Sequence, residues 1–240
     1  MSTKRGNRVW QSIVRQGYPR DEEGQSRIMV DNLFLHIHPA KVKKHSLQLS
    51  YTWGLGVITT VLFLILVITG VWLMLFYIPS TEQAYQSIQN LETSINFGTL
   101  MRNMHRWAAH LMVVAVFLHM CRVFFTGSYK HPREFNWGIG VVLWVFTLVM
   151  SYTGYLLPWD QLAYWASTVG TNIMGSVPLI GDQLRLLALG ASDVGQPALI
   201  RFYGIHVAIL PLVMTILIGV HFWRIRKDGG LSSPDEGTEE

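Results

Sequence analysis

Cysteine and charge are both scarce in this sequence. Cys121 is the single cysteine among 240 residues. One thiol excludes an internal disulfide framework and any iron–sulfur or zinc site held by four cysteines of this chain. Charged residues make up 14% of the chain, against about a quarter in ordinary soluble domains. Half of the residues are hydrophobic and the mean hydropathy is +0.28, so the composition predicts a membrane protein.

Four long segments have few or no charged residues. Residues 45–81, 135–159 and 202–223 contain no Asp, Glu, Lys or Arg. Each can supply the roughly 20 apolar residues that cross a bilayer as a helix, and the first span is expected at 47–78. The segment 103–126 qualifies only if Arg122 has a partner or extends its charge to the membrane boundary. The sequence therefore predicts an all-α fold with four transmembrane helices.

Basic residues lie mainly outside these segments. They occur in the N-terminal arm, between the second and third spans, and after the fourth span. The positive-inside rule places all three regions in the cytoplasm, and termini on the same side require an even number of spans. Topology then explains the basic charge, and no nucleic-acid partner is expected. We expect a basic cytoplasmic arm at 1–44, a membrane domain at 45–227 and a polar cytoplasmic tail at 228–240.

Two of the spans carry a histidine near each end. His105 and His119 are 14 residues apart, which in an α-helix means about 40° in azimuth and roughly 21 Å along the axis. His206 and His221 are 15 residues apart, or about 60° and roughly 22 Å. Both spans run from the outside to the cytoplasm. The histidines therefore pair by depth, His105 with His206 and His119 with His221.

Paired histidines at two depths favour metal ligation. A lone histidine in a span is more often a hydrogen-bonded interior residue or a proton relay. Here each depth supplies two nitrogens and no thiolate or carboxylate, which disfavours zinc. Two axial imidazoles are typical of a low-spin haem that carries electrons and does not bind oxygen. The predicted fold is a membrane four-helix bundle enclosing two stacked bis-histidine b haems.

Glycines repeat at the same interval on the other two spans. Gly56 and Gly70 are 14 residues apart, as are Gly140 and Gly154. Such glycines often serve helix packing alone, but two pairs in register with the histidines fit a close approach to a flat ligand. The direction of each span places Gly56 and Gly140 at the inner level and Gly70 and Gly154 at the outer level.

Two arginines flank the histidines of the second span. Arg102 lies three residues before His105, and Arg122 lies three residues after His119. Each is positioned to reach a haem propionate near one membrane face through charge-assisted hydrogen bonds. A propionate would also be the partner that Arg122 needs.

These residues lie in motifs that together resemble cytochrome b of the quinol-oxidising bc and b6f complexes. The resemblance covers about residues 30–230 and rests on the stretches NMHRWAAH, TGSYKHPREFNWGIG, TGYLLPWDQLAYWA, VPLIG, VGQPALIRFYGIH and HFWRIRKDGG. The 15-residue interval and the chain length are similar to the b6 kind. The resemblance implies that His105 and His206 bind a low-potential outer haem, and that His119 and His221 bind a high-potential inner haem.

The resemblance also implies two quinone sites. The stretch GYLLPWDQ, residues 154–161, matches part of the wall of the quinol-oxidising pocket. Within it we assign Tyr155, Pro158 and Trp159 to that wall. Arg226 and Lys227 match basic residues that lie beside the inner quinone-reducing site in the family.

One position departs from the b6 pattern. In b6-type chains a cysteine ahead of the first haem-contact glycine anchors a further haem covalently, and Gly54 stands at that position here. The single thiol, Cys121, lies elsewhere. We therefore expect two non-covalent b haems and no covalent third haem.

The resemblance implies the function of a dihaem subunit in a quinol:cytochrome c reductase, or in one that reduces a plastocyanin-like carrier. Quinol oxidised near the outer face would give one electron to a Rieske-type iron–sulfur protein and the other to the outer haem. Quinone would be reduced near the cytoplasmic face, with net proton translocation. The expected partners are the Rieske-type protein, a c-type cytochrome or similar acceptor, and a separate membrane subunit that completes the cytochrome b. The complex is expected to be a homodimer, and the chain alone is expected to be inactive.

Three other classes are compatible with part of the pattern. A dihaem membrane anchor of a dehydrogenase or hydrogenase would also pair histidines, but would not be expected to carry GYLLPWDQ or the registered glycines. A transporter or channel would use intramembrane histidines without haem. A helical assembly subunit would use them only for packing. A reduced-minus-oxidised visible spectrum separates the haem classes from the last two.

Overall fold

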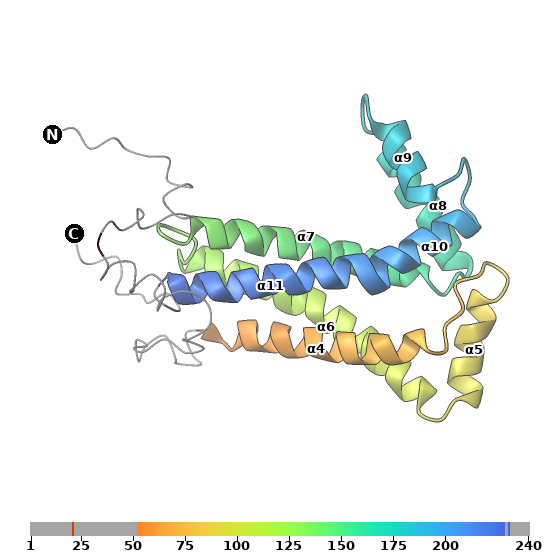
Figure 1. The fold of residues 1–240 in the computed structure, drawn as a ribbon, viewed down its shortest axis with the longest axis horizontal. Coiled ribbons are helices and arrows are strands. Elements are labelled where there is room, and N and C mark those ends of the chain that lie inside the picture. Colours follow the sequence, from red (N-terminus) through yellow and green to blue (C-terminus); the bar gives the residue numbers. More distant parts are fainter. Residues whose placement is uncertain (1–20, 22–51, 229, 231–240) are drawn as a thin grey trace. The chain divides into compact units, whose positions relative to one another are not determined.

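The computed structural model of the protein describes Asp21, residues 52–228 and Gly230. In these residues the chain forms helices joined by turns and contains no strand. Figure 1 labels the helices in chain order. Their bounds are α4 Leu55–Met74, α5 Ala84–Ser94, α6 Gly98–Phe125, α7 Glu134–Leu156, α8 Gln161–Gly175, α9 Gly181–Leu189, α10 Gln196–Gly204, η2 Ile205–Ile209 and α11 Leu210–Lys227.

Four helices of the described chain are long and apolar enough to cross a membrane. They are α4, α6, α7 and the continuous helix Gln196–Lys227 formed by α10, η2 and α11. The span that depended on Arg122 is the 28-residue helix α6. Large apolar side chains such as Val57 and Ile68 remain exposed, as the surface of a lipid-embedded helix requires. The prediction of an all-α integral membrane protein with four spans is confirmed.

The helices differ from the expected spans mainly at their ends. α4 ends at Met74 rather than at 78, shortly before Pro79, which cannot continue a helix. α6 begins at Gly98 rather than at 103. The last span begins at Gln196 rather than at 202 and carries Pro197 in its first turn, where a missing N–H costs nothing.

The described residues belong to two compact units, and each of the four spans contributes to both. The first unit takes residues up to Gly56, Phe117–Leu143 and the residues from Ile216 onward. The second unit takes Val57–Val116 and Trp144–Thr215.

In the second unit, a leucine of α4 packs against two alanines and a methionine of α6. Leu62 lies against Ala108, Met112 and Ala115, and all four are buried. Small residues let two membrane helices approach closely. This contact holds His105 of α6 beside α4.

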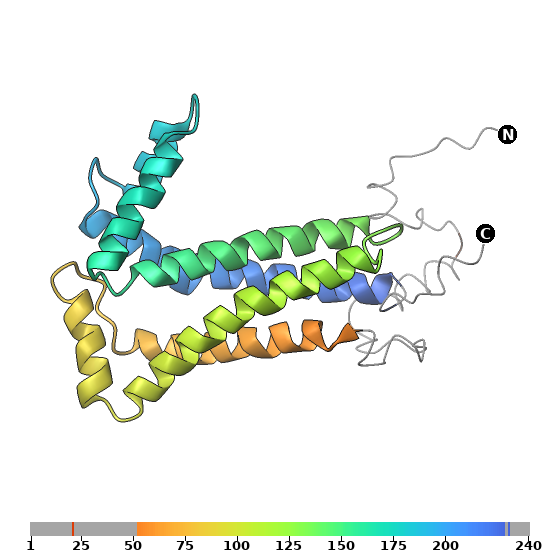
Figure 2. The same ribbon diagram turned by 180° about the vertical axis from the view of Figure 1, so that it is seen from behind.

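The second unit also contains the helices that follow α7. Helices α8, α9 and α10 are grouped together beyond the end of α7 (Figures 1 and 2). The buried cluster here consists of Leu156 of α7, Leu189 of α9, and Ala198 and Phe202 of α10. Asp160 caps α8 by accepting a 2.8 Å hydrogen bond from the Ala163 amide, which satisfies one of the free N–H groups of the first turn.

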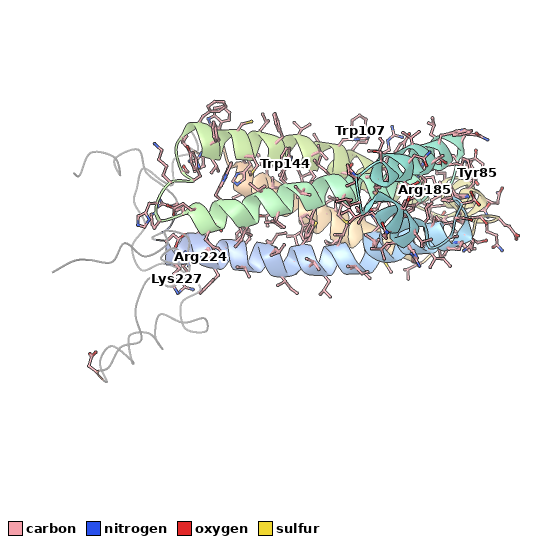
Figure 3. The ribbon with its side chains drawn as sticks, turned by 90° about the horizontal axis from the view of Figure 1, so that it is seen from above. Tyr85, Trp107, Trp144, Arg185, Arg224 and Lys227 are labelled. Atoms are coloured by element: carbon pink, nitrogen blue, oxygen red, sulfur yellow. The ribbon has the colours of Figure 1, made fainter. Side chains whose placement is uncertain are left out.

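In the first unit, the end of α11 carries a buried ion pair. Arg224 and Asp228 lie 3.0 Å apart and both are almost wholly buried. The guanidinium of Arg224 also lies 5.4 Å from the centre of the Phe135 ring on α7. Figure 3 shows Arg224 and Lys227 close together on this part of α11.

The fourth span contains a π-helical turn at one of the predicted ligands. The turn, η2, covers Ile205–Ile209 and includes His206, and the Leu210 amide donates to the Ile205 carbonyl five residues earlier. A π turn holds one residue more than an α turn. The azimuth of about 60° expected between His206 and His221 assumed an uninterrupted α-helix, and that assumption is wrong. Because the π turn holds one extra residue, the interval from His206 to His221 is equivalent to 14 residues of regular α-helix, which corresponds to an azimuth of about 40° between the two histidines.

The predicted boundaries of the arm and the tail lie largely outside the described residues. Of 1–44 only Asp21 is described, and of 228–240 only Asp228 and Gly230. The three-part division of the chain therefore stays a prediction.

Candidate functional site

His105 and His206 lie together in the second unit. His105 projects from α6 and His206 from the π turn η2, and their ring centroids are 6.2 Å apart with the planes at 69°. An imidazole nitrogen binds a metal at about 2 Å, so two imidazoles that share a metal have their binding nitrogens about 4 Å apart. The ring centroids lie further from the metal than the nitrogens do, so the distance between the centroids is longer. The observed separation fits one metal ion between the rings.

Two predicted glycines face these rings. A Cβ added at Gly70 of α4 would lie 3.2 Å from Cε1 of His105. A Cβ added at Gly154 of α7 would lie 2.5 Å from Cε1 of His206, which is far inside van der Waals contact. Glycine is therefore the residue that lets each imidazole approach its neighbouring helix. Both glycines stand at the level expected for them.

Threonine side chains, which the sequence analysis missed, contact the same two imidazoles. Thr69 Oγ1 lies 2.9 Å from Nδ1 of His105, and Thr153 Oγ1 lies 3.2 Å from Nδ1 of His206. Each threonine immediately precedes one of the glycines, in the dipeptide Thr-Gly. The sequence shows this dipeptide at both positions, but it does not show that either hydroxyl contacts a histidine.

His119 and His221 belong to the first unit and interact electrostatically. A Cβ added at Gly56 would lie 3.7 Å from Cε1 of His119, and one added at Gly140 would lie 3.8 Å from Cε1 of His221. These are ordinary van der Waals distances, looser than those of Gly70 and Gly154. The structure therefore brings together the second predicted set of histidines and glycines, with more space between them.

The two predicted arginines have different surroundings. Arg102 pairs with Glu92, the single acidic residue of α5, and the two side chains are equally exposed. Arg122 lies close enough to His119 to interact with it electrostatically. A guanidinium has five N–H donors, so the pairing of Arg102 with Glu92 leaves donors for a second acid group.

Arg226 and Lys227 occupy the last turn of α11 in the first unit. The Nζ atom of Lys227 lies 4.9 Å from the centre of the Trp223 ring, within the range of a cation–π contact. Cations at a helix C-terminus also interact favourably with the helix dipole.

The stretch GYLLPWDQ joins α7 to α8 in the second unit. Tyr155 is 52% exposed, while Leu156 beside it is fully buried. Trp159 has a φ of 52°, a left-handed conformation that is uncommon for a bulky residue. Its ring lies 6.3 Å from that of Tyr164 on α8. The last turn of α7 therefore presents Tyr155 outward, and the backbone that follows it turns sharply at Trp159.

Tyr77, between α4 and α5, holds this connection in place. Its hydroxyl donates a 2.6 Å hydrogen bond to the carbonyl of Leu157, and its ring lies 5.4 Å from that of Tyr203. Burial, with a smaller contribution from Tyr203, raises the pKa of Tyr77 above its ordinary value. The phenol therefore stays a neutral donor.

His105 and His206 have no third candidate ligand beside them among the described residues. In the described part of the chain no group of three or more His, Cys, Asp or Glu side chains gathers to hold a metal ion. A pair of imidazoles suits a metal that carries its own planar ligand. Fold and site together define an all-helical integral membrane protein with histidines paired inside its spans.

Comparisons with known proteins agree with this class. The family described as cytochrome b/b6/petB matches residues 40–229. Cytochrome b6 of Heliobacterium mobile is 44% identical over 197 residues, which cover 82% of this chain and 90% of the relative. Cytochrome b6 of Synechocystis sp. is 43% identical over 180 residues, covering 75% and 81%. The chain belongs to the cytochrome b/b6 family, as its motifs predicted.

A solved structure shares the fold. A chain of a hyperthermophilic respiratory Complex III superimposes with a TM-score of 0.74 at 32% sequence identity. The match covers 92% of this chain but 56% of that chain. The present chain therefore corresponds to little more than half the length of that neighbour.

Proposed function

We propose that this chain is the dihaem cytochrome b subunit of a bc- or b6f-type quinol oxidoreductase. In this role it would move electrons across the membrane from a quinol-oxidising to a quinone-reducing site, coupled to proton translocation. Its family and its likeness to a chain of a respiratory Complex III support the subunit assignment. The observation that carries the proposal is the His105–His206 pair, with ring centroids 6.2 Å apart on two apolar helices.

The residues of both pairs fit haem b. His105 and His206 would hold one haem and His119 and His221 the other, each through two imidazole nitrogens. When bound, haem supplies reversible one-electron transfer at its iron. The chain's own contribution would be to fix the imidazoles, exclude water with apolar helices and set the local charge.

The glycines and arginines would complete each haem site. Gly70 and Gly154 keep the imidazoles of the first pair free of steric conflict, and Gly56 and Gly140 would do so for the second. Arg102 and Arg122 would each donate hydrogen bonds to a propionate. Glu92, which pairs with Arg102, would hold the guanidinium in place.

Two parts of the chain would contact quinone. We assign Tyr155, Pro158 and Trp159 to one wall of the quinol-oxidising pocket, because Tyr155 is exposed on a backbone fixed by Tyr77 and by the Asp160 cap. We assign Arg226 and Lys227 to the quinone-reducing site, where their charge would favour the reduced, anionic forms of quinone. Both chain termini would lie on the cytoplasmic, negative side of the membrane.

The proposed partners follow from the type of complex. They are a Rieske-type iron–sulfur protein, a further membrane subunit, and a c-type cytochrome or similar electron acceptor, in a homodimeric assembly. Purifying the native complex through a tag on this chain and identifying its subunits by mass spectrometry tests this part directly. Co-purification of a dehydrogenase or hydrogenase with no Rieske-type subunit would instead assign the chain to a dihaem membrane anchor.

Redox titration of the purified complex tests the ligands. His105→Ala and His206→Ala should each remove one b haem, and His119→Ala and His221→Ala should each remove the other. His110→Ala is a matched control, because His110 also lies on α6, is exposed, and contacts only the Trp107 ring among the described aromatic residues. Two intact b haems in any of the four ligand variants would exclude the assignment of that residue.

A further inference from the structure

The two threonines next to His105 and His206 repeat one local arrangement. Thr69 and Thr153 are both almost fully buried, at 2% and 3% exposure. Each is followed by the glycine that faces the same imidazole, which lets the threonine hydroxyl reach Nδ1 of that ring. The corresponding residues before Gly56 and Gly140 are Leu55 and Ile139, whose side chains cannot accept a hydrogen bond. The arrangement therefore belongs to one histidine pair.

The hydroxyl protons of both threonines are committed within their own helices. Thr69 Oγ1 donates to the Ile65 carbonyl at 2.6 Å. Thr153 Oγ1 donates to the Val149 carbonyl at 2.9 Å. A hydroxyl has one proton and two acceptor lone pairs. In their contacts with the imidazoles, both threonine oxygens can therefore act only as hydrogen-bond acceptors.

The direction of these hydrogen bonds fixes the imidazole tautomer. Because the threonine oxygen accepts, Nδ1 of His105 and Nδ1 of His206 must carry the proton and donate. In a neutral imidazole the other nitrogen, Nε2, is then unprotonated. Both rings thus present an Nε2 lone pair.

We propose that Thr69 and Thr153 are positioning residues that hold His105 and His206 in the metal-binding tautomer and lower the reduction potential of the iron that the pair binds. The proposal rests on the haem-binding function proposed above. A hydrogen-bond acceptor on the far nitrogen fixes the orientation of a ligating histidine and raises its basicity. A more basic imidazole stabilises the ferric state over the ferrous state, which lowers the potential.

The test replaces each hydroxyl without changing the shape of the side chain. Thr69→Val and Thr153→Val remove the acceptor but keep both branches at Cβ, while Thr69→Ser and Thr153→Ser keep the hydroxyl. Thr215→Val is the matched control, because Thr215 makes the same bond to a carbonyl of its own helix, that of Pro211, at 2.7 Å, and contacts no histidine among the described residues. All variants are examined in the purified complex by potentiometric titration and by electron paramagnetic resonance of the oxidised haems.

The expected result is specific to one haem. Each valine variant should raise the midpoint potential of the haem bound by His105 and His206 and change its resonance signal, and the double valine variant should raise the potential further. The serine variants and Thr215→Val should keep the native potential, and the haem bound by His119 and His221 should keep its potential in every variant.

Several outcomes would overturn the proposal. They are an unchanged or lowered potential in the valine variants with haem retained, an equal shift at both haems, or the same shift in the serine variants. If a valine variant loses the haem, retention with native potential in the serine variant supports the hydroxyl, whereas loss in both overturns it. Failure of the proposed function is recognised separately, because then the native complex would contain no b haem, or His105→Ala and His206→Ala would leave both haems in place.

Discussion

The hydroxyl of Tyr77 donates a 2.6 Å hydrogen bond to the carbonyl of Leu157, 80 residues further along the chain. This bond ties the segment after α4 to the GYLLPWDQ connection. Replacing Tyr77 by phenylalanine leaves the Leu157 carbonyl without this donor, and we expect a loss of about 1 kcal/mol in stability. Thermal unfolding of the detergent-solubilised complex measures this loss. Tyr85→Phe is the control, because Tyr85 is half exposed, and an equal loss in both variants would contradict the prediction.

The same tyrosine predicts a dependence of stability on alkaline pH. Burial raises the pKa of Tyr77 in the folded protein above the value of about 10 that an unfolded tyrosine has. The unfolded state therefore loses its proton first as the pH rises. The stabilisation from Tyr77 should be complete below about pH 10 and should decline above it. The difference in melting temperature between the native protein and Tyr77→Phe, followed from pH 8 to 11, should shrink; a constant difference would argue against a raised pKa.

The four glycines should differ in their tolerance of a methyl group. At Gly154 an added Cβ would lie 2.5 Å from the His206 ring, whereas at Gly140 the nearest atom would be 3.7 Å away. Overpacking of this kind costs typically about 1–3 kcal/mol. Gly154→Ala should therefore lower the occupancy of the haem bound by His105 and His206, and Gly140→Ala should leave both haems nearly complete. Gly138→Ala, which meets nothing within 4 Å, is the control in a pyridine haemochrome assay, and equal losses at all three positions would refute the ranking.

Gly54 should leave the chain without a covalent haem. Its φ is +62°, a left-handed conformation that a side chain makes unfavourable, and it offers no sulfur for a thioether bond. Denaturing electrophoresis should strip this band of all haem stain, while a c-type cytochrome on the same gel retains its stain. A stained band whose mass is raised by one haem would disprove the prediction.

The π turn predicts opposite effects for a deletion and an insertion. Deleting Val207 shortens the His206–His221 interval to the 14 residues of a regular helix, which the turn can accommodate by becoming α-helical. Adding an alanine after Leu212 lengthens the interval and rotates one histidine by about 100°. Visible spectra should show both haems in the deletion variant and the loss of one in the insertion variant. A deletion of Val113, in the regular helix α6, should behave like the insertion, and equal tolerance of all three changes would contradict the role of the turn.

The sequence predicted the four spans because their signal is large and local. Lipid-facing helices need long apolar runs, and α4 and, after its first residue Glu134, α7 lie within such runs. The pairing of His105 with His206 and the levels of the glycines followed from one repeated interval and the direction of each span. Helices α5, α8 and α9 gave no such signal. They are short, and the buried residues of α9 include Leu189, which clusters with Leu156 of α7, 33 residues earlier in the chain.

Two features of the site were beyond sequence reasoning for a physical reason. A threonine in a membrane helix usually bonds to a carbonyl of its own helix, and Thr69 does so, so nothing in its position reveals that its second lone pair faces His105. The π turn around His206 is likewise invisible, because its residues are ordinary helix-compatible apolar residues. Only the hydrogen bond from Leu210 back to Ile205 identifies it.

The π turn also bears on how chains of different ligand spacing are compared. A histidine interval of 15 residues and one of 14 look like two different ligand geometries when residues are simply counted. When a π turn holds the added residue, the 15-residue and the 14-residue intervals give the two histidines the same relative orientation. A single residue inserted in the fourth span then changes the sequence but leaves the ligand positions unchanged. Its structural sign is the wider π-helical turn that contains His206.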